Sequence, residues 1–226
     1  MDHVETAEIA AAPAETVPAP KPDPAKVEVS ALDVGATEET VAALIREACE
    51  AGIRAVVVRP CDLDLAARSI SDKTILAAAI SYPGGTATTS VKVYEARDAL
   101  RRGAREIHAA VNVGKLNSRQ FQYVEMELIQ LAQTCHEAGA KLRAVLRTPL
   151  LNEEAKLVVA KIAKRSEVDS VIAEYAEAPP EDESLLLRKC PPLVEVIAHR
   201  STAADCLRAL SDEGFSGVHA PIGVLR

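Results

Sequence analysis

A small (β/α)8 TIM barrel is the fold that the sequence predicts, because strand-like and helix-like segments alternate along it with regular spacing. Eight runs rich in β-branched or small apolar residues occupy positions 27–30, 54–58, 74–81, 106–112, 142–147, 169–174, 193–198 and 216–220. Strands about 25–35 residues apart with helices between them form right-handed βαβ units, and therefore a parallel sheet. Eight such strands within about 200 residues favour a closed barrel. An open doubly wound sheet is the alternative, but its glycine-rich first turn is not matched by SALDVGAT after the first run.

The helices between the strands have recognisable ends. Thr37 and Asn152 each precede a helical stretch, where their side chains can accept a free backbone N–H group. Glycines at positions 52, 103, 139 and 214 follow helical stretches, where a left-handed turn costs glycine least. The helix after residue 117 has one apolar stripe, made of Phe121, Val124, Leu128, Leu131 and Cys135.

The last strand is followed only by PIGVLR, so we expect the final helix of a complete barrel to be missing. Its absence would leave apolar surface for the tail or another subunit to cover.

Two parts of the chain differ in composition. Residues 1–26 hold five of the thirteen prolines, which predicts an extended, Ala/Pro-rich disordered tail, while 27–226 form the barrel. A short helix over VETAEIAAA, docked on a protein partner, is the alternative for the tail.

Composition excludes several functional classes. The net charge is −7 and the basic residues are scattered, which argues against a nucleic-acid partner. The N-terminus lacks a basic start and an apolar block, and the run ILAAAI is too short to span a membrane, so we expect a soluble cytoplasmic protein. The five cysteines show no metal-ligand spacing and are expected to be reduced and structural; no cofactor is predicted.

Two long segments lie where a barrel keeps its chemistry, at the carboxyl ends of strands. They are SYPGGTATTSVKVYEARDALRRGAREIHAAVNVGKLNS at 81–118 and LRAVLRTPLLNEE at 142–154. Both resemble the deoxyribose-phosphate aldolase family, in which an aromatic-Pro-x-Gly-x-x-Thr-Thr turn leads into x-Val-Lys-Val, and strands 4 and 5 end in Asn-x-Gly and Thr-x-Leu-Leu. Weaker likeness extends over nearly all of residues 27–223.

This resemblance implies a Schiff-base mechanism. In the family, a lysine on strand 6 attacks a small aldehyde, a second lysine on strand 7 lowers the pKa of the first, and an aspartate on strand 4 relays protons. The family phrase Ala-Asp-Phe-Val-Lys-Thr-Ser falls on residues 168–174, so Ile172 stands at the nucleophile position. Isoleucine cannot form an imine, and we therefore expect a divergent member without Schiff-base activity.

The other family positions are changed as well. Glu195 stands at the second lysine, His108 at the aspartate, Arg143 at the strand 5 cation and Glu28 at the strand 1 aspartate. The glycine-rich phosphate turns after strands 7 and 8 read AHRST and HAPIG, which argues against phosphate binding by the family's route. His199 and Arg200 offer a different anion contact, although the acidic loop EAPPEDES nearby would oppose it and could instead pair with Arg147.

Two interpretations of these replacements remain open. Glu195 with Arg143, and Glu28 with His108, can neutralise each other as plain packing, since a buried charge is costly unless paired. The alternative is an enzyme with changed chemistry, in which His108 and Glu195 act as an acid–base pair on a carbonyl substrate.

The expected ligand is a small polar carbonyl or sugar-type metabolite. A metal among His108 and the two carboxylates is disfavoured, because positions on separate strands do not define ligand geometry. A protein that serves only in an assembly, as a homo-oligomer or through its tail, is the remaining alternative. The candidate ligand-binding residues are Glu28, Asn112, Arg143, Arg147, Thr148 and His199.

Overall fold

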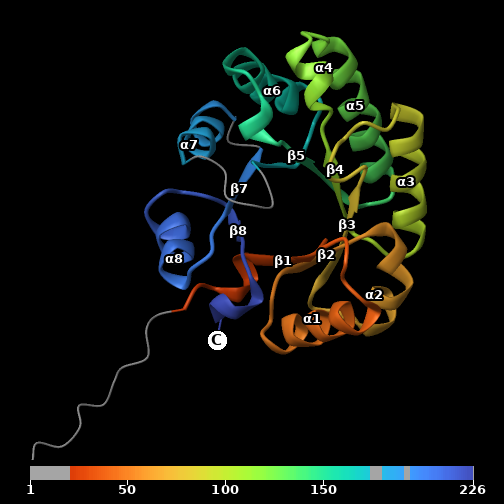
Figure 1. The fold of residues 1–226 in the computed structure, drawn as a ribbon, viewed down its shortest axis with the longest axis vertical. Coiled ribbons are helices and arrows are strands. Elements are labelled where there is room, and N and C mark those ends of the chain that lie inside the picture. Colours follow the sequence, from red (N-terminus) through yellow and green to blue (C-terminus); the bar gives the residue numbers. More distant parts are fainter. Residues whose placement is uncertain (1–20, 174–179, 191–193, 226) are drawn as a thin grey trace, which may run out of the picture.

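The chain forms a closed barrel of eight parallel strands in sequential order, surrounded by helices (Figure 1). The computed structural model describes residues 21–173, 180–190 and 194–225. The strands are β1 (Val27–Ala31), β2 (Ala55–Val58), β3 (Ile75–Ile80), β4 (Glu106–Ala110), β5 (Lys141–Val145), β6 (Ser170–Ile172), β7 (Glu195–His199) and β8 (Gly217–His219). The predicted TIM barrel is confirmed, and each strand lies within two or three residues of its predicted position.

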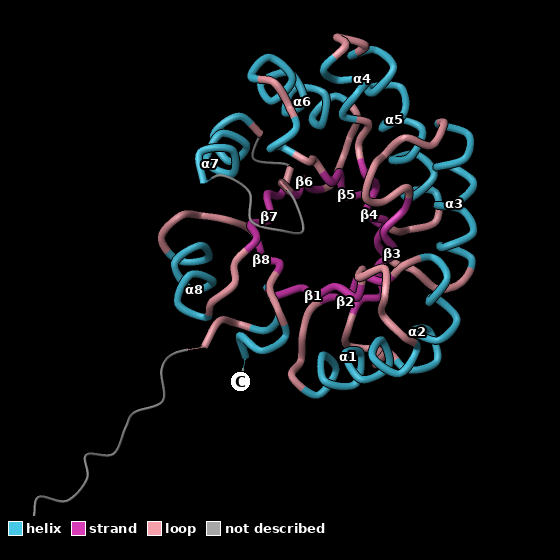
Figure 2. The backbone as a smooth tube through the Cα atoms, viewed as in Figure 1, coloured by secondary structure: helices cyan, strands magenta, loops and turns pink. Residues whose placement is uncertain are grey.

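A ring of helices covers the outside of the strands (Figure 2). They are α1 (Glu38–Glu50), α2 (Leu63–Ser69), α3 (Thr89–Arg101), α4 (Val113–Asn117), α5 (Phe121–Glu137), α6 (Glu153–Arg165), α7 (Pro180–Lys189) and α8 (Ala203–Ser211). Four short 3-10 turns complete the described chain: η1 (Pro24–Lys26), η2 (Pro60–Asp62), η3 (Thr148–Leu150) and η4 (Ile222–Leu225). The turn after β8 is η4, which lies against α1 where a full barrel has its eighth outer helix.

The predicted helix ends are present. Thr37 accepts a hydrogen bond from the backbone N–H of Thr40, and Asn152 accepts one from Ala155. The glycines at 52, 103, 139 and 214 all have positive φ angles, as the turns require. Residues 1–20 of the predicted tail lie outside the described residues.

Another glycine, Gly85, fixes the turn after β3 against the end of β4. Its φ is 64°, and a Cβ at this position would lie 2.5 Å from the carbonyl oxygen of Val111. A side chain at this position would therefore meet both an unfavourable backbone conformation and a rigid neighbour.

One segment differs from its prediction. The acidic stretch EAPPEDES was expected to be a loop, but from Pro180 onward it forms helix α7. Glu181, Asp182 and Glu183 occupy the first turn of this helix, where the partial positive charge of the helix terminus favours carboxylates. Residues 174–179 of the stretch lie outside the described residues, and with them any contact between the acidic loop and Arg147.

The described helices include none that is both long enough and apolar enough to cross a bilayer. The five cysteines are free thiols, and burial raises the pKa of Cys135 to about 12 and that of Cys190 and Cys206 to about 11. A thiol with a raised pKa is a poor nucleophile at neutral pH, which agrees with a structural role.

Candidate functional site

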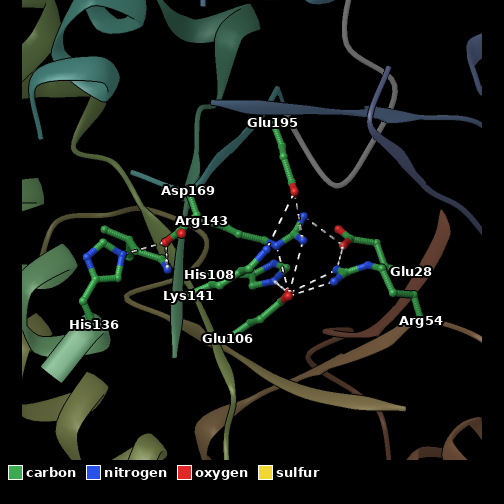
Figure 3. A network of polar contacts seen from close by, with 10 residues as sticks. Glu28, Arg54, Glu106, His108, His136, Lys141, Arg143, Asp169 and Glu195 are labelled. Carbon is green, nitrogen blue, oxygen red and sulfur yellow. Dashed lines mark hydrogen bonds and ion pairs between the residues drawn. The ribbon is translucent and has the colours of Figure 1, made fainter. Parts of the chain in front are cut away.

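A charged cluster fills the amino end of the barrel interior (Figure 3). Alternate residues of each strand face inward, which brings Glu28 of β1, Glu106 of β4 and Arg143 of β5 together, and Arg54 joins them from the residue before β2. Arg54 lies 2.7 Å from Glu28 and 2.8 Å from Glu106, and Arg143 lies 2.8 Å from Glu106 and 3.4 Å from Glu28. Each carboxylate therefore faces two guanidinium groups.

The two predicted catalytic residues occupy different parts of this cluster. The Nε2 atom of His108 lies 3.5 Å from the Oε2 atom of Glu106. Glu195 lies at the rim, where its carboxylate is 3.6 Å from Arg143 and 3.7 Å from Lys141. The expected contact between Arg143 and Glu195 is thus present, whereas His108 contacts a carboxylate that the sequence did not single out. The catalytic role of His108 and Glu195 stays a prediction.

Opposite charges keep both buried carboxylates ionised. Burial alone raises the pKa of Glu106, but hydrogen bonds from His108 and Arg54 and the charge of Arg143 outweigh it and hold this pKa far below its usual value. Burial likewise opposes ionisation of Glu28, and the nearby charges of Arg143, His108 and Arg54 lower its pKa below the ordinary range. Burial lowers the pKa of His108, although Glu106 and Glu28 oppose this.

The same cluster contains the one group of possible metal ligands among the described residues. Single ligand atoms of Glu28, Glu106 and His108 lie within 4.8 Å of one another. Both carboxylates already neutralise Arg54 and Arg143, and a divalent cation would have to enter beside these two fixed positive charges. The donor set therefore does not fit a resident metal.

An apolar layer lies directly above the charged cluster, toward the carboxyl ends of the strands. Ile172 is fully buried in this layer and follows Ser170 by two residues on β6, so both face the interior. The layer consists of Val57, Ala77, Ala79, Val145, Ile172 and Ile197, with Leu32 and Tyr82 packed against it. Within this layer, the side chain at position 172 is therefore surrounded by aliphatic side chains.

No buried lysine of the described residues reaches the barrel interior. Lys92 is the one fully buried lysine, and it lies on α3, outside the strands. Its Nζ donates hydrogen bonds to the carbonyl of Ala110 and to the carboxylate of Glu127 on α5, at 2.9 and 2.6 Å. Lys141 lies at the amino end of β5, where its side chain is 51% exposed.

Three polar residues meet near the carboxyl end of the barrel, on neighbouring strands. His199 of β7 and His219 of β8 approach with their Nδ1 atoms 3.1 Å apart, and the Nε2 atom of His219 lies 2.9 Å from the hydroxyl of Ser30 on β1. Ser30, His219 and His199 are called the histidine relay below. They line a cavity of about 370 Å³ together with apolar residues that include Leu44, Pro221 and Ile222.

Burial of His219 should make the protein less stable in mild acid. Burial lowers the pKa of His219 to about 4, with a smaller opposing effect of Glu28. An unfolded histidine has a pKa near 6.5, so the unfolded chain binds more protons between these values, and stability falls as pH drops through this window. At about pH 5 this histidine alone should reduce the free energy of unfolding by about 2 kcal/mol relative to neutral pH.

Denaturant unfolding at about pH 7.5 and pH 5 measures this dependence. The variant His219→Gln should show a smaller difference between the two conditions than the unmodified protein. An equal difference in the two proteins would contradict the assignment to His219.

A second cavity, of about 530 Å³, opens at the carboxyl end of the barrel. Arg147, Asp33, Arg59 and Tyr82 line it, together with apolar residues from the turns after β1, β2 and β3. Arg59 is bound to Asp62 at 2.6 Å and to the carbonyls of residues 33, 34 and 36, so it shapes the wall. Of the predicted ligand-binding residues, Arg147 is the one placed in this cavity.

The remaining predicted positions have local roles. Asn112 caps α4 by accepting a hydrogen bond from the backbone N–H of Lys115. Thr148 is buried at the start of η3. Arg200, an expected anion contact, pairs instead with Glu183 and Glu213, and Glu183 also accepts the backbone N–H of His199.

Sequence reasoning missed Arg54, Glu106, Ser30 and His219. Glu106 had a usable signal, because it stands two residues before His108 and so faces the same side of a strand. Arg54 had no such sequence signal, because it precedes β2 and its contacts form only when the barrel closes.

The fold is a (β/α)8 barrel whose interior holds a charged cluster at the amino end and an aliphatic layer above it. A family model described as DeoC/LacD family aldolase matches residues 25–178. The chain belongs to this family.

Curated relatives agree with the family. Deoxyribose-phosphate aldolase of Thermococcus gammatolerans is 36% identical over 139 residues, and that of Enterococcus faecalis is 34% identical over 137 residues. In both cases the match spans 60% of this chain and 62% of the relative.

Solved structures extend the likeness to nearly the whole chain. The aldolase QR15 superposes with a TM-score of 0.79 and 25% identity, covering 89% of this chain and 92% of that one. Deoxyribose phosphate aldolase from Aeropyrum pernix, described as tetrameric, has a TM-score of 0.77 and 23% identity, covering 87% of this chain and 85% of that one.

Proposed function

We propose that this protein is a divergent member of the deoxyribose-phosphate aldolase family without Schiff-base activity, which binds a small polar carbonyl or sugar-type metabolite. The observation that carries the first part is Ile172, fully buried in an aliphatic layer at the position of the nucleophilic lysine. An imine requires a primary amine, and the buried Lys92 is held by Glu127 outside the barrel.

The charges around the second lysine position support the same conclusion. In the family this position carries a cation that lowers the pKa of the nucleophile, because neighbouring ammonium groups disfavour each other's charge. Glu195 carries the opposite charge and lies 3.6 Å from Arg143. The register of the strands pairs Glu195 with Ser170 and Ile172 with Ile197, so the second lysine position supplies no ammonium group that could lower the pKa of an amine at position 172.

The cavity at the carboxyl end supports binding of a polar metabolite. Its wall combines the cation Arg147 and the carboxylate Asp33 with apolar surface from Leu32 and Tyr82. A volume of about 530 Å³ suits a small ligand, and this end of a barrel is where ligands bind.

Reductive trapping tests the loss of Schiff-base chemistry. Incubation with acetaldehyde or deoxyribose 5-phosphate, followed by borohydride, should leave the intact mass of this protein unchanged. The deoxyribose-phosphate aldolase of Thermococcus gammatolerans, treated in parallel, provides the positive control. A stoichiometric adduct on a single lysine, beyond the slow alkylation of exposed amines that the denatured chain also shows, would overturn the proposal.

Thermal-shift screening of the untreated protein with sugars, sugar phosphates and small carbonyl compounds tests whether it binds a polar metabolite. A shift with one compound class that is lost in Arg147→Gln, but kept in the surface variant Arg119→Gln, is the expected result. The absence of any shift would favour the alternative of a protein that acts only through protein partners.

A further inference from the structure

The histidine relay joins three strands that are neighbours in the barrel, β7, β8 and β1 (Figure 2). His219 is the central member and is 4% exposed, while Ser30 and His199 are partly exposed beside the cavity of about 370 Å³. Ser30 lies two residues after Glu28 on β1, and the register of the strands places Glu28 opposite His219. The relay is separate from position 172 and from the cavity that contains Arg147.

The two short contacts restrict the protons of the relay. Two Nδ1 atoms 3.1 Å apart share one proton, so one imidazole donates and the other accepts. When His219 donates from Nδ1 to His199, its Nε2 atom is unprotonated and accepts the hydroxyl proton of Ser30 at 2.9 Å. This arrangement has a nucleophile, a base and a group that orients the base, each within hydrogen-bond distance of the next.

We propose that Ser30 is an activated nucleophile for acyl transfer from small esters, with His219 as its general base and His199 as the residue that positions His219. This activity is independent of the proposed metabolite binding. Leu44, Pro221 and Ile222 line the adjoining cavity and supply the apolar surface that an acyl or alkyl group needs.

The chemistry balances without any further reactant except water. The Oγ atom of Ser30 forms a bond to the ester carbonyl carbon while its proton passes to Nε2 of His219. The bond from that carbon to the leaving oxygen then breaks, and the departing alcohol takes the proton from His219. Water attacks the acyl carbon in the second half, again giving a proton to His219, which returns it to Ser30 as the carboxylic acid leaves.

The surroundings of His219 suit this exchange. The imidazole is neutral at physiological pH because burial lowers its pKa, so it can accept a proton. The negative charge of Glu28 favours the imidazolium that forms during the reaction, as its effect on the pKa of His219 shows.

Labelling with an alkyl fluorophosphonate tests the proposal without knowledge of the natural ester. The probe forms a phosphorus–oxygen bond with an activated serine and releases fluoride, and the adduct is found by intact mass and peptide mapping. The expected result is one adduct, on Ser30, which is absent in Ser30→Ala. The matched control Ser69→Ala removes a partly exposed serine whose hydroxyl donates to the carbonyl of Leu65, and it should label like the unmodified protein.

The rate of labelling separates the two histidines. His219→Gln should slow it by about 100-fold or more, as expected for loss of a general base. His199→Ala should slow it by about tenfold, and His199→Asn should recover part of the rate, because Oδ1 of asparagine can accept the Nδ1–H of His219. Absence of labelling in the unmodified, folded protein, or labelling at another residue that survives Ser30→Ala, would overturn the proposal.

Discussion

Replacing Arg143 with methionine should lower the free energy of unfolding by about 3–5 kcal/mol, the usual cost of breaking a buried ion pair. Arg143 is 1% exposed and contacts both Glu28 and Glu106, which are themselves fully buried. Without it, Arg54 is the one remaining guanidinium of the cluster that faces the two buried carboxylates. Denaturant unfolding of the variant and the unmodified protein at neutral pH measures the difference.

A surface pair provides the control for this change. Arg119 contacts Glu154 at 2.7 Å with its side chain 72% exposed, so Arg119→Met should cost less than about 1 kcal/mol. The double variant Arg143→Met with Glu106→Gln should recover part of the loss, because it removes one uncompensated charge. If Arg143→Met costs no more than Arg119→Met, the charged cluster does not stabilise the barrel.

Restoring the family lysine as Ile172→Lys should destabilise the protein by about 4–5 kcal/mol at neutral pH, because a buried lysine becomes neutral there and the penalty is set by the distance from pH 7 to its unfolded pKa of about 10.4. Fully buried lysines have pKa values about 3–5 units below normal, and each unit corresponds to about 1.4 kcal/mol. A lowered native pKa means that the unfolded chain binds the proton more readily, so stability should decrease further as pH falls through the range between the two pKa values.

Ile172→Met is the matched control, since it keeps the volume and apolar character of the side chain and should cost less than about 1.5 kcal/mol. Unfolding at about pH 7 and pH 9.5 separates burial of charge from poor packing, because only the lysine variant should regain stability at the higher pH. A lysine variant as stable as the methionine variant would show that the interior solvates an ammonium group, and would reopen the question of aldolase chemistry.

The fold could be predicted from sequence because its signals are local. Caps such as Thr37 and Asn152, and glycines such as Gly52, act within one helical turn, and eight repeats of the same unit leave few other topologies. The segment that was misjudged, Pro180–Lys189, begins with proline and carboxylates, which suit a helix start as well as a loop.

The partners within the barrel were harder to predict, because they depend on register between strands far apart in sequence. Arg54 precedes β2, and only the closed barrel shows that it contacts both Glu28 of β1 and Glu106 of β4. The position of His219 opposite Glu28 likewise arises where the last strand pairs with the first. A sequence gives the side of the strand that each residue faces, but not its depth in the barrel.

Gly85 shows that sequence similarity to catalytic aldolases can have a structural cause. It belongs to the aromatic-Pro-x-Gly turn that relates this chain to its family, and its backbone conformation and closeness to Val111 have a mechanical reason that involves no substrate. Lys92, in the next part of the same motif, ties α3 to β4 and α5. These motif residues stabilise the packing of the barrel, and their contacts do not depend on the residues that carry out catalysis. A chain can therefore keep the sequence motif of an enzyme family after its catalytic residues have been replaced.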